Sequence, residues 1–569
     1  MDEITVAKYL VSRIPETGVS VVPVLQGGAI MKFIDEVGEN PALTYISPNH
    51  EQALSMMVEA YARLNGFGVG MVTSGPGAQN LATGIACAYY DSTPCLFITG
   101  QVGMFHSKAN RAVRQRGFQE TDVVSMMKPI TKYAVLLDRA EDARYVFEKA
   151  LYLAKSGRPG PVLIDVPYNV QRAMIDPEKL RTFIPEEDSS GSILINEGVI
   201  HNIFNDLEEK ERPIILIGGG VHISNQAEKV RELVSKLQIP VVATWPAVDI
   251  FEIENPMYIG NIGRAGNKSA NRAIRSSDLV IALGTRFATK AIIDEKNFAK
   301  DAKIIAIDID SGELNDGLIV PQVKICCDLK ELLPRLLKMA DEVNLPPKVE
   351  WLKSVAKTKA QHLKNNTTPP GTVYVDPYEF TEKLSKVLDS NTIIVGDTGT
   401  NLCWFTQAYQ AKFGQRFISS WGNSPMGYAL PASIGAYLAK RDATIVSISG
   451  DGGVQMNIQE FQTIALHKLP IKIFILNNNC YANVKFPAIE QFQGRFHALG
   501  KGMGYEAPDF VKIAQAYGLT SFALEKKDDL EATIKMVFET PGPVVVDVKV
   551  DPEQVAFEDL ELISIPPKK

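Results

Sequence analysis

Two oxygen-bearing side chains stand where they could share one cation. The segment 449–453, Ser-Gly-Asp-Gly-Gly, follows the apolar run 444–448. Asn478 stands 27 positions after Asp451, at the end of the next apolar run, 471–476. Oxygen ligands at the ends of neighbouring strands can converge on one hard cation such as Mg²⁺, which bridges to phosphate oxygens. The spacing therefore predicts a metal site at the edge of a sheet.

The glycines around Asp451 suit an anion beside that cation. Gly450, Gly452 and Gly453 let backbone amides approach a diphosphate, and the start of the following helix favours negative charge. A lone Gly-Asp-Gly fits an ordinary strand-to-helix turn better. Its combination with an Asn-Asn pair at the end of the next apolar run favours a diphosphate and metal site instead.

The elements that must position these turns repeat along the chain as short runs rich in Val and Ile, separated by amphipathic helical stretches. The clearest runs are 68–72, 213–217, 279–283, 303–307, 444–448 and 471–476. Continuous apolar runs of this length suit strands buried on both faces of a parallel sheet, and sites form where such strands end. The pattern predicts an α/β protein with three doubly wound parallel-sheet domains.

Two polar stretches divide the chain of 569 residues, for which length alone suggests three or four domains. One lies around 170–197 and the other around 346–376, and both have the Pro, Ser, Asn and acidic composition of inter-domain linkers. The predicted domains are 1–170, 190–340 and 370–550. The tail that ends at Lys569 is expected to be frayed or to lie over a neighbour.

Composition excludes several classes of protein. With 45% hydrophobic and 22% charged residues the chain is globular rather than disordered. A net charge of −7 argues against sequence-independent nucleic-acid binding. Six cysteines without a CxxC pair give neither a disulfide framework nor a structural zinc site. The start of the chain does not resemble a signal peptide, and no apolar run reaches membrane-spanning length, so we expect a cytoplasmic protein with no membrane contact.

Further motifs accompany the turn at Asp451 in a fixed order. They lie at 49–53, 73–77, 99–102, 117–120, 157–161 and 426–431. Together with GDG…NN they resemble the motifs of thiamine diphosphate-dependent enzymes, and the resemblance extends over almost the whole chain to the acetolactate (acetohydroxyacid) synthase-like branch. It implies that the first domain binds the cofactor's pyrimidine ring and the third its diphosphate with Mg²⁺. The central domain would be a spacer or a site for FAD or another nucleotide.

The resemblance places the reacting groups in the first domain. Glu51 matches the glutamate that touches the pyrimidine ring, where one well-placed carboxyl performs acid–base work. Phe118 and Gln119 match residues that line the reaction pocket, and Gln101 matches a second pocket glutamine. These four residues are the catalytic candidates.

The resemblance places the cofactor-binding residues in the third domain. They are Thr398, Gly399, Thr400, Asn401, Ser424, Met426, Gly450, Asp451, Gly452, Gly453 and Asn478. Met426 matches the large apolar residue that holds the cofactor bent, and the Ser424 carbonyl would accept from the pyrimidine amine. The implied metal ligands are Asp451, Asn478 and the backbone carbonyl of Cys480, whose thiol is a poor ligand for Mg²⁺.

The activity implied by the resemblance is carboligation. The cofactor acts as an electron sink, a 2-oxo acid such as pyruvate loses carbon dioxide, and the acyl carbanion attacks an acceptor carbonyl. A simple 2-oxo acid decarboxylase or a C–C hydrolase uses the same residues and remains an alternative. An oxalyl-CoA or benzoylformate-type decarboxylase is less favoured, and the intact Glu51, Asp451 and Asn478 argue against a non-catalytic regulatory subunit. Because the two cofactor domains pair between subunits in this family, the resemblance implies a homodimer or homotetramer with sites between subunits.

Two departures from this branch leave the acceptor and the flavin open. Pro487 stands where synthases place the tryptophan that selects the acceptor. The turns 284–290 and 166–170 differ from those of flavin-bearing members, although glycines remain at 218–220 and 263–266. A glycine-rich turn alone is weak evidence for a dinucleotide.

The third departure is a loop between Gln101 and Phe118 that is longer than in synthases. It carries His106, Lys108, Arg111, Arg114 and Arg116. Such a run can be a solvated surface or a subunit contact. It can also form an anion site at the mouth of the pocket, because guanidinium groups suit phosphate and carboxylate. Together with 244–249, the loop resembles thiamine enzymes of unusual sugar biosynthesis, whose acceptor is a keto group on a nucleotide-linked sugar.

Overall fold

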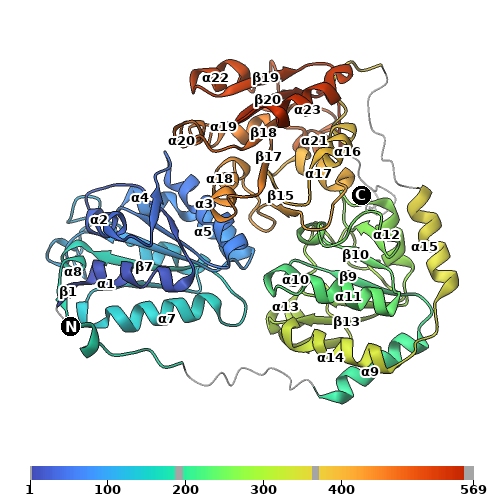
Figure 1. Cartoon of the computed structure of the whole chain (residues 1–569), viewed down its shortest axis with the longest axis horizontal. Helices are drawn as coiled ribbons and strands as arrows, with labels where there is room; N and C mark the ends of the chain where they lie inside the picture. Colours follow the sequence, from blue (N-terminus) through green and yellow to red (C-terminus); the bar gives the residue numbers. More distant parts are fainter. Residues whose placement is uncertain (1–2, 186–195, 362–370, 557–569) are drawn as a thin grey trace.

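The computed structural model describes residues 3–185, 196–361 and 371–556. It contains three α/β units, which Figure 1 shows in blue to cyan (N-terminal), green to yellow (central) and orange to red (C-terminal). The main sheet of each unit is parallel, with helices packed against it. The predicted class, three doubly wound α/β domains, is confirmed, because the long Val and Ile runs are the buried strands of these sheets.

The N-terminal unit is built on a four-stranded sheet in the order β4-β5-β7-β6, which a bridge from Val24 to Met71 extends toward the pair β2-β3. Its strands are β1 (Ile4–Thr5), β2 (Val21–Pro23), β3 (Thr44–Ile46), β4 (Gly68–Val72), β5 (Cys95–Gln101), β6 (Tyr133–Leu136), β7 (Val162–Pro167) and β8 (Met174–Ile175). Its helices are α1 (Val6–Ser12), α2 (Met31–Glu39), α3 (Glu51–Asn65), α4 (Pro76–Asn80), α5 (Ala82–Tyr90), α6 (Val123–Met127), α7 (Ala143–Lys155) and α8 (Tyr168–Gln171).

The central unit is a six-stranded parallel sheet in the order β11-β10-β9-β12-β13-β14. Its strands are β9 (Pro213–Ile217), β10 (Val241–Ala243), β11 (Tyr258–Asn261), β12 (Leu279–Leu283), β13 (Lys303–Asp308) and β14 (Val323–Cys326). Its helices are α9 (Glu197–Glu209), α10 (Gly220–Ile223), α11 (Ala227–Leu237), α12 (Lys268–Ser276), α13 (Ser311–Asp316), α14 (Leu329–Glu342) and α15 (Val349–Gln361).

The C-terminal unit is also a six-stranded parallel sheet, in the order β16-β15-β17-β18-β20-β19. Its strands are β15 (Thr392–Gly396), β16 (Arg416–Ile418), β17 (Thr444–Gly450), β18 (Lys472–Asn477), β19 (Thr520–Leu524) and β20 (Val544–Lys549). Its helices are α16 (Pro377–Val387), α17 (Thr400–Ala408), α18 (Ala429–Ala439), α19 (Asp451–Gln455), α20 (Glu460–Leu466), α21 (Ala482–Phe492), α22 (Phe510–Ala516) and α23 (Leu530–Glu539).

The N- and C-terminal units meet through helices α3 and α18. Gly435 of α18 comes so close to α3 that a Cβ there would lie 2.2 Å from the Met57 carbonyl oxygen. A buried polar cluster continues this contact: Glu59 receives the Tyr428 hydroxyl and pairs with Arg63, which also pairs with Asp91. Buried charges need such partners, so these groups fix the relative placement of the two units.

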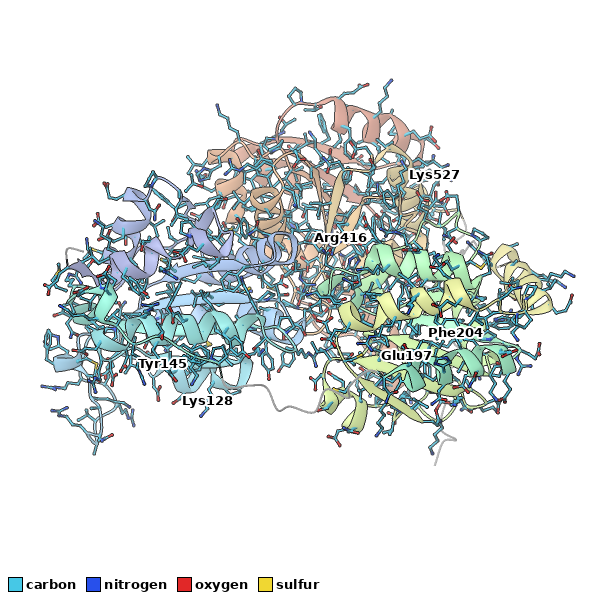
Figure 2. All side chains as sticks on the ribbon, turned by 60° about the horizontal axis from the view of Figure 1, so that its bottom comes forward. Lys128, Tyr145, Glu197, Phe204, Arg416 and Lys527 are labelled. Atoms are coloured by element: carbon cyan, nitrogen blue, oxygen red, sulfur yellow. The ribbon has the colours of Figure 1, made fainter. Side chains whose placement is uncertain are left out.

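The central and C-terminal units meet at a second buried carboxylate. Asp249 accepts from the Arg416 side chain at 3.2 Å and from the Phe417 N–H at 2.8 Å, and it pairs with His222 at 2.6 Å. Figure 2 shows Arg416 at this junction, whereas Tyr145 lies on the N-terminal unit and Phe204 on the central one. Burial alone would raise the pKa of Asp249, but His222 and Arg416 lower it to about 2.

One expected linker is partly helical. Helix α15 occupies the first half of the stretch 346–376, and its Trp351 is buried and donates from Nε1 to the Pro213 carbonyl at 2.9 Å. The helix forms because one face packs on the central unit despite the polar composition around it. Parts of both expected linkers, and the tail after residue 556, lie outside the described residues. Among the residues that are described, no helix is long and apolar enough to cross a bilayer.

Candidate active site

The candidate site lies where the strand order of the C-terminal sheet reverses. The chain moves outward from β15 to β16 and then returns past β15 to β17 and β18, so the ends of β15 and β17 form a topological switch point. Ligands of open α/β sheets bind at the carboxyl ends of strands at such a point. Asp397 follows β15, Asp451 follows β17 and Asn478 follows β18, which brings the predicted residues to one edge.

Asp397 ties the turns of this edge together. Its fully buried carboxylate accepts the N–H of Thr398 at 2.8 Å and of Gly427 at 3.0 and 3.1 Å, and the Ser449 hydroxyl at 2.9 Å. A Cβ on Gly453 would lie 2.9 Å from Asp397 Oδ2. Burial raises the pKa of Asp397 to about 6, against the effect of these donors. Three segments of the site, around residues 398, 427 and 449–453, therefore meet at one carboxylate.

The turn between β15 and α17 has the form of an anion cradle. Gly399 is the N-cap of α17 with a φ of +115°, a conformation that favours glycine. The hydroxyl of Thr400 is buried and has no hydrogen-bond partner within the described residues. Asn401 instead donates to the Asp397 carbonyl at 3.1 Å, and the Thr398 hydroxyl bonds to that of Ser424 at 2.6 Å. A helix N-terminus with an unused hydroxyl is suited to phosphate oxygens.

Two further buried atoms at this edge lack partners. Asp451 accepts the Gly452 N–H on Oδ1 at 2.9 Å. The Tyr505 hydroxyl and the Asn479 and Cys480 N–H groups lie near its carboxyl, but among the described residues no donor reaches Oδ2 at full hydrogen-bonding geometry. The Nδ2 atom of Asn478 is likewise buried without a partner there, whereas the neighbouring amides of Asn477 and Asn479 bond to Asp547 and to the Ala507 N–H. Burial raises the pKa of Asp451 to about 7.

These unused atoms fit a bound metal and diphosphate. Buried polar atoms are almost always hydrogen-bonded, so three exceptions at one edge are consistent with a ligand there. The Thr400 hydroxyl and Asn478 Nδ2 are donors for phosphate oxygens, whereas Asp451 Oδ2 and Asn478 Oδ1 are the oxygens that suit Mg²⁺. Carboxylate, amide and carbonyl oxygens are the donor set that Mg²⁺ prefers. The predicted third ligand, the Cys480 carbonyl, follows Asn478 closely and already accepts the Ala482 N–H at 2.9 Å, which leaves one lone pair.

Met426 and its neighbours shape the floor of the site. Ser424 and Gly427 both have positive φ, +49° and +85°, so the chain bends sharply on either side of Met426. A Cβ on Gly452 would lie 3.1 Å from the Met426 methyl carbon and 2.3 Å from the Tyr481 ring. Gly452 is therefore required by close packing as well as by access to an anion.

In the N-terminal unit, the catalytic candidate Glu51 is the first residue of α3. His50 caps this helix by accepting the Gln52 N–H on Nδ1 at 3.0 Å. Asn80, the last residue of α4, donates to Glu51 Oε2 at 3.0 Å. The other oxygen lies 3.3 Å from where a Cβ of Gly77 would stand. One oxygen is thus held in place, and the other remains for a ligand.

Gln101 is placed at the end of β5 with its amide already engaged. Its Nε2 donates to the Thr121 carbonyl and to Asp165, both at 2.8 Å, and its Oε1 accepts the Val102 N–H at 2.9 Å. The Thr99 hydroxyl donates to the same Asp165 at 2.6 Å, and burial raises the pKa of this aspartate to about 7. In this arrangement Gln101 joins the two ends of the 102–121 loop instead of pointing a free amide at a substrate.

Glu120 organises the middle of that loop. Its carboxylate accepts the N–H of Lys108, Arg116 and Gly117 at 2.6, 2.9 and 3.2 Å, and the Ser107 hydroxyl at 2.9 Å. Partial burial opposes ionisation, but these donors lower the pKa of Glu120. The fold of the loop leaves the Phe118 side chain 86% exposed beside it.

Gln119 follows Phe118 with a φ of +60°. Gly75 packs against its backbone, since a Cβ there would lie 2.7 Å from the Gln119 carbonyl oxygen. Within the described ranges, no hydrogen bond joins Glu51, Gln101, Phe118 or Gln119 to the residues around Asp451 and Asn478. The residues around Glu51 and those around Asp451 thus form two separate groups, which are the predicted pyrimidine and diphosphate half-sites.

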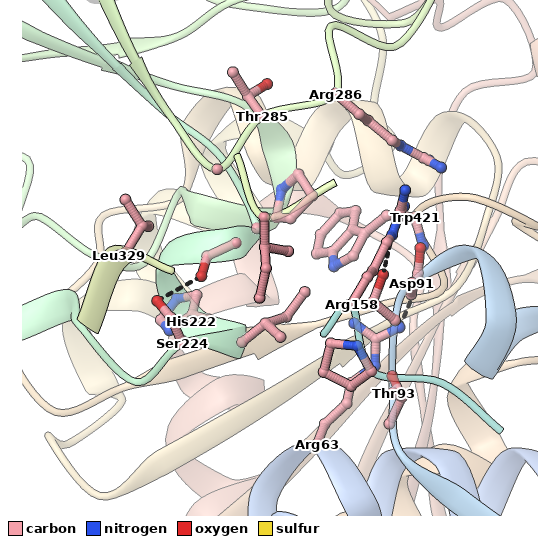
Figure 3. A pocket seen from close by; sticks show the side chains of 18 of the residues that line it. Arg63, Asp91, Thr93, Arg158, His222, Ser224, Thr285, Arg286, Leu329 and Trp421 are labelled. Atoms are coloured by element: carbon pink, nitrogen blue, oxygen red, sulfur yellow. Dashed lines mark hydrogen bonds and ion pairs between the residues drawn. The ribbon is translucent and has the colours of Figure 1, made fainter. Parts of the chain in front are cut away.

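A cavity of about 600 Å³ lies between the three units (Figure 3). Arg63, Asp91 and Arg158 line it from the N-terminal unit, His222 and Arg286 from the central unit and Trp421 from the C-terminal unit. Arg158 is held by Asp310 at 2.9 Å and Glu313 at 2.6 Å. Asp308, at the end of β13, faces the same cavity, and burial raises its pKa to about 6.

The glycine-rich turn of the central unit has a packing role. A Cβ on Gly218 would lie 2.2 Å from the Gly284 carbonyl oxygen, and one on Gly220 would lie 2.7 Å from Gly284 Cα. The turns after β9 and β12 thus touch backbone to backbone, which only glycine allows. The cavity wall also carries an unused donor, because Trp245 Nε1 is buried without an acceptor among the described residues.

The sequence analysis missed the carboxylates that hold the site. Asp397, Asp165 and Glu120 were not among the candidates, and neither was Glu460, which accepts the Asn49 N–H at 3.0 Å. Asp397 follows the end of β15, Asp165 lies within β7, Glu120 is the last residue of the motif 117–120 and Glu460 begins α20. Their residue type and spacing do not by themselves show that they accept hydrogen bonds from the site.

Comparison with family models adds an independent observation. Residues 4–126 match the N-terminal TPP binding domain of thiamine pyrophosphate enzymes, residues 200–336 match the central domain, and residues 397–548 match the C-terminal TPP binding domain. The last match begins at Asp397 and contains every unpartnered atom of the switch point described above.

Whole proteins show the same likeness. The chain is 34% identical to acetolactate synthase 1, chloroplastic, of Nicotiana tabacum, over 95% of this chain and 80% of that protein. It is 33% identical to the acetolactate synthase isozyme 1 large subunit of Escherichia coli, over 97% and 95%. It is 32% identical to the acetolactate synthase large subunit of Lactococcus lactis, over 95% and 92%.

We expect Asp397→Asn to weaken the binding of thiamine diphosphate. The asparagine amide has one acceptor oxygen where the carboxylate has two. One buried donor among Thr398, Gly427 and Ser449 therefore loses its partner, at a cost of about 1–3 kcal/mol. Affinity measured by titration calorimetry with Mg²⁺ present should fall about fivefold to a hundredfold. Asp442→Asn, on an exposed turn of the same unit, is the matched control. Equal affinities for the two variants would contradict the role of Asp397.

Proposed function

The chain belongs to the thiamine pyrophosphate enzyme family, in its acetolactate synthase-like branch, and on this premise we propose that it decarboxylates pyruvate and joins the two-carbon unit to an acceptor carbonyl. The observation that carries the proposal is the group of unused buried atoms of Thr400, Asp451 and Asn478 at the switch point of the C-terminal sheet. Enzymes of this branch act by carboligation, and the chain keeps the residues that this chemistry needs.

We assign the diphosphate and Mg²⁺ to this edge. Asp451, Asn478 and the Cys480 carbonyl would hold the metal, and the turn 398–401 with Gly450, Gly452 and Gly453 would hold the diphosphate. When bound, thiamine diphosphate supplies an electron sink for the loss of carbon dioxide from a 2-oxo acid. We assign the support of the bent cofactor to Met426, because its methyl group lies beside Gly452 of the proposed diphosphate turn.

We assign proton exchange with the pyrimidine ring to Glu51. Asn80 holds Oε2, so Oε1 is the oxygen that remains for the ring. Phe118 and Gln119 would close the reaction pocket and exclude water from it, which suppresses protonation in place of carboligation. For Gln101 we propose an indirect role, because its amide spans Thr121 and Asp165 and so fixes the loop that carries Phe118.

We propose that each complete site forms between two copies of the chain, in a homodimer or a homotetramer. The two half-sites of one chain share no hydrogen bond within the described residues, and Phe118 is exposed beside the pyrimidine half-site. A second copy that presents its diphosphate half-site to Glu51 would cover Phe118 and complete the pocket. Burial of apolar side chains of this kind is the usual driving force of such an interface.

For the cavity between the three units we propose a dinucleotide such as FAD. Its volume of about 600 Å³ lies in the range of cofactor sites. Asp308 at a strand end suits ribose hydroxyls, and Arg286 and Lys290 on its wall suit phosphates. The glycines at 218–220 do not support the assignment by themselves, because backbone packing already requires Gly218 and Gly220.

A second candidate acceptor has one observation in its favour. Arg111 and Arg116 both donate to the Ser107 carbonyl at 3.3 Å, so two exposed guanidinium groups converge near Phe118. Such a pair suits the phosphates of a keto group carried on a nucleotide-linked sugar. Pro487, in place of the tryptophan that selects the usual acceptor, agrees with a different acceptor.

We expect pyruvate alone, with thiamine diphosphate and Mg²⁺, to give acetolactate. Mass spectrometry of the products separates this from a simple decarboxylase, which gives acetaldehyde. Glu51→Gln should lower kcat by about 10²- to 10⁴-fold, because it removes the acid–base group. Glu39→Gln, at the exposed end of α2, is the control. Acetaldehyde as the sole product, both with pyruvate alone and with a nucleotide-linked keto-sugar added, would overturn carboligation, and full activity of E51Q would overturn the role of Glu51.

We expect the purified protein to carry a flavin that is visible in its absorbance spectrum and is released on denaturation. Asp308→Asn should lower the occupancy severalfold, because it removes a charged acceptor for hydroxyl groups. Asp301→Asn, at the opposite end of β13, is the matched control. If a nucleotide without flavin bands is released instead, the cavity is a nucleotide site and the FAD assignment is wrong.

We expect Arg111→Ala with Arg116→Ala to raise the KM of a nucleotide-linked keto-sugar acceptor about fivefold or more, because charge-assisted hydrogen bonds are lost. The KM of pyruvate as donor should stay within twofold. Arg139→Ala, an exposed arginine on the same unit, controls for surface charge. Steady-state kinetics measure both KM values. An acceptor KM equal to that of the control variant would contradict the proposed anion site.

A further inference from the structure

In each chain, the C-terminal unit forms hydrogen bonds with the turn that precedes Glu51. Glu460 is the first residue of α20, and its side chain is fully buried. It accepts the Asn49 N–H at 3.0 Å on one oxygen and 3.3 Å on the other. Asn49 stands two positions before Glu51, so this contact reaches from the diphosphate-binding unit to the pyrimidine half-site.

The side chain of Asn49 is held by the same segment. Its Nδ2 donates to the Gln459 carbonyl at 3.2 Å and to the Thr463 hydroxyl at 3.0 Å. The Thr463 hydroxyl donates in turn to Glu460 Oε2 at 2.6 Å. Backbone and side chain of Asn49 are thus fixed by three neighbouring residues of the C-terminal unit. Glu460 is the central acceptor among them.

The segment that contacts Asn49 belongs to the same stretch of chain, 451–463, as the proposed diphosphate turn. Glu460 stands nine positions after Asp451, with only α19 and a turn between them. In that turn Asn457 donates to the Gly427 carbonyl at 2.8 Å and touches Met56 Sδ at 3.7 Å. The segment 451–463 therefore contacts the floor of its own diphosphate half-site and the first turns of α3 in the same chain.

We propose that Glu460 is a positioning residue for Glu51 of its own chain, and that it therefore acts on the active site that contains the partner copy's diphosphate half-site. The inference rests on the proposed function, in which each site combines two copies. Loss of the carboxylate leaves the Asn49 N–H without its buried acceptor, and the turn before α3 then relaxes. Since α3 begins at Glu51, a shift of that turn moves the Glu51 carboxyl relative to its ligand.

Mixed dimers test this directly. A chain with Glu51→Gln and a differently tagged chain with Asp451→Ala are co-expressed and purified through both tags. Each homodimer lacks one essential group in both sites, whereas the mixed dimer has one intact site. That site uses Glu51 of the D451A chain and Asp451 of the E51Q chain. Activity of the mixed dimer together with inactive homodimers is the starting condition.

Glu460→Ala is then added to one chain at a time. In the D451A chain it removes the support of the working Glu51, and kcat should fall at least tenfold below that of the parent mixed dimer. In the E51Q chain it stands beside a Glu51 that is already replaced, so the loss should be much smaller. A merely structural defect would lower activity equally from either chain. Glu460→Gln, which keeps one acceptor oxygen, should fall between the parent and E460A when placed in the D451A chain.

Two controls keep the outcomes separate. Melting temperatures of all mixed dimers exclude loss of fold, and Glu539→Gln on exposed α23 controls for loss of an acidic group. A larger loss from the E51Q chain would show that Glu460 serves its own diphosphate turn, and it would overturn the inference, as would equal losses. An inactive parent mixed dimer would instead refute the site between two copies.

Discussion

Buried carboxylates that accept main-chain N–H groups and side-chain donors hold this protein's site together. Asp397 gathers the turns after β15 and before α18, Glu460 grips the turn before α3, and Asp165 receives the amide of Gln101. Burial raises the pKa of these groups to about 6 or 7. Burying a carboxylate costs free energy, and here that loss is offset because one carboxylate accepts hydrogen bonds from several segments at once.

The same principle explains how the units are joined. Glu59, Arg63, Asp91 and Tyr428 form a buried polar cluster between the N- and C-terminal units, and Asp249 joins Arg416 to His222 between the C-terminal and central units. Close packing of α3 on α18 leaves no space for a side chain at position 435. Helix α3 thus connects the start of the pyrimidine half-site with the wall of the central cavity, which Arg63 lines. Ligands at the two places would share one rigid element.

The proposed division of each site between two copies agrees with these contacts. Glu460 holds the turn before Glu51 against the C-terminal unit of the same chain, and Asn80 holds Glu51 Oε2. In the proposed assembly a second chain supplies the diphosphate half-site to Glu51. The exposed Phe118, which lies on a loop that Glu120 and Gln101 organise, would then lie at the interface as well as in the pocket.

The order of short apolar runs and polar turns was enough to predict the α/β class and the three units, because strand burial and strand-end polarity are local patterns. The spacing of Asp451 and Asn478 was enough to predict that both stand at one edge of a sheet, since neighbouring parallel strands end at the same edge. Residue types did not reveal the roles of Asp397, Asp165, Glu120 and Glu460. Glu460 meets Asn49 more than four hundred positions away, and such a contact exists only after the units have packed. Tertiary structure also decided that Gly218 and Gly220 serve packing, that α15 is a helix, and that Gln101 is engaged. Each outcome depends on which backbone lies opposite, and no local pattern contains that information.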